Sequence, residues 1–132
     1  MIALIPNENI TTQDLKLLRK VSDLSISEIK HAAINRTPIA TFEQFGSNWE
    51  TDRTVLAKLA NNYIQEQNLP YQFALIEDSE IDEFLKPENL KNVLQSLRQI
   101  ELETQRNTDL EMGYISNPLE FEPHDDDWTI LE

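Results

Sequence analysis

The fold is decided by residues 15–30, which read LKLLRKVSDLSISEIK. Apolar side chains recur every three residues in the first half, after a cap at Thr11-Thr12, and this spacing predicts a helix. Its inward residues are Leu15, Leu18, Val21 and Leu24. Ser25 and Glu28 then have capping-box spacing, in which the hydroxyl and the carboxylate each satisfy a free amide at a helix start. A second short helix is therefore expected, and its inward residues are Ile26, Ile29, Ala33 and Ile34.

Outside this helical pair, three short apolar runs predict strands at 2–5, 39–45 and 71–76. Ser47 and Glu50 repeat the capping-box spacing and predict a third helix that begins near Trp49. Its expected core stripe consists of Val55, Leu56, Leu59, Ala60, Tyr63 and Ile64.

A fourth helix is expected from Pro87 to about Thr108, since proline suits the first helical position, where its missing amide costs nothing. Its apolar face consists of Leu90, Val93, Leu94, Leu97 and Ile100. The segment Glu77–Glu83 before it is expected to be an acidic turn. Gly113 and Pro118 punctuate the remainder, which is expected to be mostly irregular.

This order, strand-helix-helix-strand-helix-strand, predicts an α+β fold in which helices cover one face of a three-stranded sheet. The fourth helix would pack on an edge or on the open face. A chain of 132 residues suits one domain, which we place at 1–108, followed by an acidic C-terminal tail at 109–132. The expected core includes Leu18, Ile29, Phe42, Leu59 and Phe73.

Charge is distributed very unevenly along the chain, whose net charge is −13. Residues 51–132 carry 18 acids against 6 bases, whereas residues 1–50 carry 6 against 5. No Lys or Arg follows Arg106. Such a surface repels nucleic acid and anionic membranes, attracts basic proteins and speeds their association at low salt.

We therefore expect a basic protein partner, bound through two acidic regions and the aromatic residues between the acids. The candidate partner-binding residues are Glu77, Asp78, Glu80, Asp82, Glu83, Asp109, Glu111, Phe121, Glu122, Asp125, Asp126, Asp127 and Trp128. Trp49 is a further candidate anchor. The alternative is that the acids only solvate the chain, although solvating tails are poor in aromatic residues.

Residues 1–76 resemble the C-terminal domain of the bacterial ribosomal stalk protein, through the 15–30 segment and the order of elements. The resemblance implies the same fold, and it implies that Lys16, Arg19 and Lys30 lie where that family contacts translation factors. Several features depart from the family, among them the net charge of −13. Lys20 and Ser25 stand where the family has glycines between the helices, and the segment after residue 76 has no counterpart. Fold alone does not carry function, so we expect these three basic residues to form an ordinary exposed helix face that pairs with nearby acids.

Catalytic equipment is scarce in this sequence. There are two histidines, two glycines and no cysteine, which disfavours thiolate metal sites, nucleophilic triads and phosphate-binding loops. His31 is expected to be an ordinary helix residue. The run from His124 to Asp127 could hold a divalent cation weakly, but it lacks the spacing of a calcium loop. We expect no enzyme activity and no cofactor. The lack of cysteine suits a reducing compartment, so a cytoplasmic location is expected.

These properties together favour a stoichiometric inhibitor, namely an immunity protein that neutralises a basic nuclease toxin. The chain is similar in size and charge to the immunity proteins of contact-dependent growth inhibition and colicin systems. The alternatives are a ribosome- or translation-factor-associated binding module that uses the stalk-like helical pair, and a nucleic-acid mimic.

Overall fold

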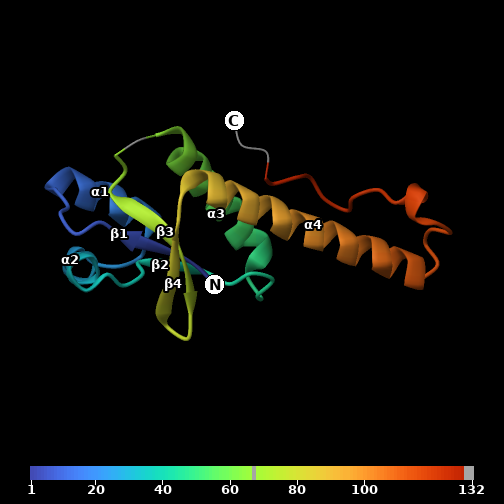
Figure 1. The fold of residues 1–132 in the computed structure, drawn as a ribbon, viewed down its shortest axis with the longest axis horizontal. Helices are drawn as coiled ribbons and strands as arrows, with labels where there is room; N and C mark the ends of the chain where they lie inside the picture. Colours follow the sequence, from blue (N-terminus) through green and yellow to red (C-terminus); the bar gives the residue numbers. More distant parts are fainter. Residues whose placement is uncertain (67, 130–132) are drawn as a thin grey trace.

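The computed structural model describes residues 1–66 and 68–129, and Figure 1 shows its elements. In chain order they are β1 (Ile2–Pro6), α1 (Thr12–Val21), α2 (Ile26–Asn35), β2 (Ala40–Phe42), α3 (Trp49–Gln65), β3 (Tyr71–Glu77), β4 (Glu80–Leu85), α4 (Pro87–Glu111) and a 3-10 turn at Pro118–Glu120. The α+β class and the predicted order of elements through residue 76 are confirmed.

The sheet is antiparallel and has four strands in the order β2-β1-β3-β4, so the predicted three-stranded sheet is wrong. The missing strand is β4, which occupies most of the segment expected to be an acidic turn. Only Asp78 and Ser79 form the turn. Their φ angles are both positive, 51° and 67°, as in the two-residue turns whose backbone fits the twist of the strands of a hairpin. The strand was not predicted because a run of acidic residues is more typical of a loop than of a strand.

The main core lies on one face of the sheet and receives side chains from all four helices. The five predicted core residues, Leu18, Ile29, Phe42, Leu59 and Phe73, are all buried. Leu90, Leu94 and Leu97 of α4 join the same cluster. The fourth helix therefore lies beside α3 and adds to the helical layer, instead of covering the open face.

Some residues of the predicted helical stripes lie outside the core. Ile26, Ile34, Val55 and Ile100 are exposed. In α2 the buried residues are Ile29, Ala32 and Ala33, so this short helix buries only its middle. Apolar spacing identified each helix correctly, but it did not fix which apolar residues face inward.

Capping boxes explain the starts of two helices, and the third helix begins at Trp49 as predicted but with a different cap. Thr11 and Ser25 both form complete capping boxes, and Ser25 Oγ accepts from the Glu28 amide at 3.2 Å. The predicted cap at Ser47 is wrong, because Asn48 precedes α3 and makes no side-chain capping bond. The Trp49 amide donates to the Gly46 carbonyl at 3.1 Å, so a tight turn leads directly into the helix.

Arg36 partly covers the second face of the sheet. It is the C-cap residue of α2 and has a left-handed backbone conformation. Its guanidinium donates to the Pro6 carbonyl and to Gln72 Oε1, both at 3.0 Å, and lies 5.2 Å from the centre of the Phe84 ring. Ala3, Ile5 and Ala74 are fully buried on this face. One cation thus ties α2 to three strands.

Helix α4 projects from the body along the long axis of the molecule, and the chain then returns beside it (Figure 1). The helix ends at Glu111, so the boundary expected after residue 108 falls within it. Residues 112–129, the return segment, run back toward α3. In the part of the chain that the structure describes, no helix combines the length and the apolar character needed to cross a membrane.

Candidate functional site

The first group of predicted partner-binding residues lies on the β3–β4 hairpin. Glu77, Asp78, Glu80, Asp82 and Glu83 are all exposed. Glu77 and Glu80 stand directly opposite each other across the two strands. Like charges in that position are destabilising. The hairpin therefore displays its carboxylates at a cost in folding free energy.

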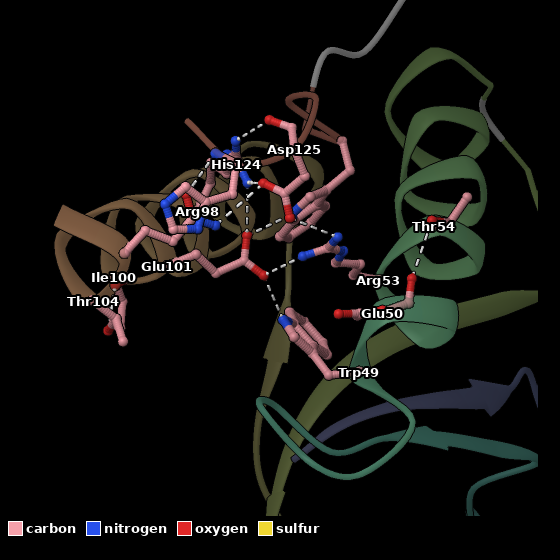
Figure 2. Close-up of polar contacts among 12 residues, drawn as sticks. Trp49, Glu50, Arg53, Thr54, Arg98, Ile100, Glu101, Thr104, His124 and Asp125 are labelled. Atoms are coloured by element: carbon pink, nitrogen blue, oxygen red, sulfur yellow. Dashed lines mark hydrogen bonds and ion pairs between the residues drawn. The ribbon is translucent and has the colours of Figure 1, made fainter. Parts of the chain in front are cut away.

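The second group lies on α4 and the return segment, around the buried carboxylate of Glu101. Trp49 Nε1 and Arg53 Nη1 each donate to its Oε2 at 2.8 Å. Trp128 Nε1 donates to Oε1 at 2.7 Å, and Arg98 Nη1 donates to the same oxygen at 3.1 Å. Figure 2 shows Glu101 reaching from α4 toward α3. Four donors from three segments thus satisfy one carboxylate.

Asp125 completes this cluster from the return segment, above Arg98 and Arg53 in Figure 2. Arg98 Nη1 lies 2.7 Å from its Oδ1, and Arg53 Nη2 lies 3.0 Å from its Oδ2. Gln105 also donates to Oδ1, at 3.3 Å. We call Arg53, Arg98, Glu101 and Asp125 the clamp, because it holds the return segment against α4 and α3.

The clamp keeps its carboxylates charged. Burial alone would raise the pKa of Asp125, but the hydrogen bonds from Arg98, Gln105 and Arg53 outweigh it and lower that pKa to about 2. Burial likewise opposes ionisation of Glu101, but the donors around it lower its pKa. The two arginines and two carboxylates balance, so the clamp carries no net charge.

Aromatic packing reinforces the clamp. The rings of Trp49 and Trp128 meet edge to face, with centroids 5.6 Å apart, and Phe45 meets Trp49 in the same way at 5.6 Å. Such pairs are worth about 0.5–1.5 kcal/mol beyond their buried area. Trp49 and Trp128, both considered as partner anchors, are therefore committed to internal contacts.

The remaining acids of the second group divide into bonded and free carboxylates. His124 Nε2 lies 2.8 Å from Oδ2 of the buried Asp109. Asp127 accepts from the amide and the hydroxyl of Thr129 at 2.8 and 2.6 Å. Among the described acids of this second group, three are exposed and make no hydrogen bond or ion pair: Glu111, Glu122 and Asp126. Phe121 is half-buried, with its ring centre 6.1 Å from that of His124.

Sequence reasoning missed the centre of the clamp. Arg53, Arg98 and Glu101 were not singled out, because an Arg-Glu pair three residues apart on a helix normally lies in solvent. The apolar stripe predicted that Ile100 faces inward, but the structure exposes Ile100 and buries Arg98 and Glu101 instead. Among the described residues, no group of three or more His, Asp or Glu side chains could hold a metal ion.

Comparison of the chain with models of protein families, with curated proteins and with solved structures gives no match. The placement of this chain's own residues is therefore what bears on its function.

Proposed function

We propose that this protein is an immunity protein, which binds a basic nuclease toxin and neutralises it by occupying the substrate cleft. The observation that carries the proposal is the display of unpaired carboxylates. Residues 51–132 carry 18 acids and 6 bases. The clamp pairs two of these acids with two of the arginines, so it does not reduce the net negative charge. The five hairpin acids are all exposed.

Nuclease clefts are lined with Lys and Arg, because these side chains contact the phosphates of the substrate. A protein that presents many carboxylates can compete for the same cations. Opposite charge also steers the two proteins together and makes their association fast and sensitive to salt. An inhibitor that must act before the toxin damages the cell gains from such a fast encounter.

The test uses the nuclease domain that we expect beside the gene of this chain. The purified domain is titrated with the full-length protein, while nucleic-acid cleavage and the association rate are measured as salt is raised. We expect inhibition at a one-to-one ratio and an association rate that falls with salt. Glu80→Gln with Asp82→Asn should slow association, whereas Lys16→Ala with Arg19→Ala should leave it unchanged.

Two results would contradict this proposal. One is a neighbouring gene that encodes no nuclease domain, and the other is a nuclease whose activity the protein leaves untouched. Inhibition that survives unchanged in the hairpin variant but fails in the Lys16 and Arg19 variant would favour the second candidate function.

The second candidate is a translation-factor-binding module that uses α1 and α2. It is favoured by two exposed apolar side chains on these helices. One was predicted to be buried, and the other lies between basic residues. Ile34 is 76% exposed on α2, and Leu17 is exposed beside Lys16 on α1. Purified elongation factors would bind this helical face, and Ile34→Ser would weaken that binding.

A further inference from the structure

The first part of the return segment, directly after α4, exposes an unusual set of apolar side chains. We call residues 112–121 the tip. Leu119 is 96% exposed, Tyr114 70% and Met112 62%. Single exposed apolar residues are ordinary on protein surfaces, but three large ones in one short segment suggest an interaction site.

Local hydrogen bonds hold the tip in shape. The Tyr114 amide donates to the Asp109 carbonyl at 2.9 Å, and the Leu119 amide donates to Asn117 Oδ1 at 2.9 Å. The Glu120 carboxylate accepts from the Ser116 amide at 3.3 Å and from Asn117 Nδ2 at 3.0 Å. A turn ordered in this way loses little conformational entropy when it binds.

The position of the tip suits entry into a cleft. The clamp fixes the return segment at Glu101, and α4 extends for a further ten residues to Glu111, about 15 Å at the helical rise. Figure 1 shows the tip at one end of the long axis of the molecule, away from the sheet. A partner can therefore surround the tip without meeting the body.

Charge complementarity selects the occupant. From Asn107 to Thr129 the chain has seven acids and no Lys or Arg. Glu111 and Glu122 flank the tip with exposed carboxylates. Two tips meeting each other would bring carboxylates against carboxylates, whereas a basic surface on a partner would neutralise them.

We propose that the tip is the apolar anchor of the binding surface, and that its partner is a basic protein with an apolar pocket rimmed by Lys or Arg. Tyr114 and Leu119 enter the pocket, and Glu111 and Glu122 meet the cationic rim. This rests on the proposed function and deepens it, since it assigns the tightest contact to the tip and leaves steering to the hairpin. Buried aromatic and apolar anchors carry most of the free energy of such contacts.

The experiment begins with two photo-crosslinking forms of the full chain, made in the source cell. One carries p-benzoylphenylalanine in place of Leu119, and the matched control carries it in place of Ile34, which is also exposed. We expect a crosslink from position 119 to one basic protein and none to that protein from position 34. No crosslink from position 119, or a crosslink only to a second copy of this chain, overturns the proposal.

The crosslinked protein is then purified, and its affinity is measured for Tyr114→Ser with Leu119→Ser and for Ile34→Ser. We expect the tip variant to bind about 30-fold more weakly or worse, mainly through faster dissociation, and Ile34→Ser to bind like the wild type. Denaturation curves of both variants should match the wild type, because all three side chains are exposed.

The outcomes separate this proposal from the proposed function. If the tip variant binds normally while Glu80→Gln with Asp82→Asn fails, the tip proposal is overturned and the inhibitor proposal stands. If the tip variant loses binding but the partner is not a nuclease, the tip proposal stands and the nuclease inhibitor does not.

Discussion

Glu101 and Asp125 each bind the same two guanidinium groups, those of Arg53 and Arg98. The arginines come from α3 and α4, one acid comes from α4, and the other comes from the return segment. Three segments are therefore joined by a set of charges that are all partly or fully buried. Removing either acid leaves two guanidinium groups to share one remaining carboxylate.

This arrangement predicts that Glu101→Gln will be strongly destabilising. Breaking a buried ion pair by removing one partner costs about 3–5 kcal/mol, because an uncompensated charge stays behind. We expect a loss of about 3 kcal/mol in the free energy of unfolding, measured by urea denaturation. Glu103→Gln, an exposed neighbour on the same helix, should stay within about 0.5 kcal/mol of the wild type. Equal curves for both variants would mean that the clamp contributes nothing.

The contribution of Asp125 to stability should depend on pH. Its folded pKa of about 2 lies below the ordinary value of 3.8, so its ionised form stabilises the fold above about pH 4, and that stability is lost as pH falls toward 2. Asp125→Asn should therefore be less stable than the wild type at neutral pH, by a margin that narrows below pH 4. The check is urea denaturation across this range, with the unbonded and exposed Asp126→Asn as control. A margin independent of pH would contradict it.

Trp128 should determine whether the return segment stays in place. Trp128→Ala removes both the hydrogen bond to Glu101 and the ring contact with Trp49. We expect faster amide hydrogen exchange across residues 112–129 and unchanged exchange in β1 and β3, since local opening exposes only the released segment. Tyr114 lies in the same segment but is exposed, so the amides of the Tyr114→Ala variant should exchange as in the wild type.

Leu59 and Val55 should behave differently, although both were predicted to lie in the core stripe of α3. Leu59 is buried in the main core and Val55 is exposed. Leu59→Ala should cost about 2–5 kcal/mol through lost burial and the cavity it leaves. Val55→Ala should change the free energy of unfolding by no more than about 0.5 kcal/mol. Both losses can be measured by thermal or chemical denaturation. A larger loss for Val55→Ala than for Leu59→Ala would mean that the inward face of α3 is misplaced.

The two serines of the predicted capping boxes provide another matched pair. Ser25→Ala should destabilise the protein by about 1 kcal/mol, because the Glu28 amide loses its acceptor at the start of α2. Ser47→Ala should have almost no effect, since Asn48 holds the cap position of α3. A comparable loss in both variants would place Ser47 back at the helix start.

Sequence patterns predicted the elements well and their long-range contacts poorly. Three-residue apolar spacing and proline at position 87 identified all four helices, because these signals are local. The strand β4 was missed because its pairing with β3 depends on tertiary contact, and its acids favour a loop when the segment is considered alone. The clamp was missed for a similar reason, since Arg53 and Asp125 are far apart in the sequence and nothing local connects them.

The candidate site shows the same division. The sequence identified the acids of the hairpin and the return segment, and the structure exposes the hairpin acids and Glu111, Glu122 and Asp126. Composition could not tell that Asp109, Asp125 and Trp128 are bonded internally. It also could not tell which apolar residues of the return segment would be left in solvent at the tip.

The place of β4 at the end of the strand order has one more consequence. An edge strand offers free amide and carbonyl groups to the edge of any other sheet, and proteins block such pairing with charged side chains. Glu80, Asp82 and Glu83 supply that protection over a strand of six residues. Neutralising them removes a barrier to aggregation as well as a binding surface. Each hairpin variant therefore needs its molecular mass measured beside its affinity, so that self-association is not mistaken for weakened binding.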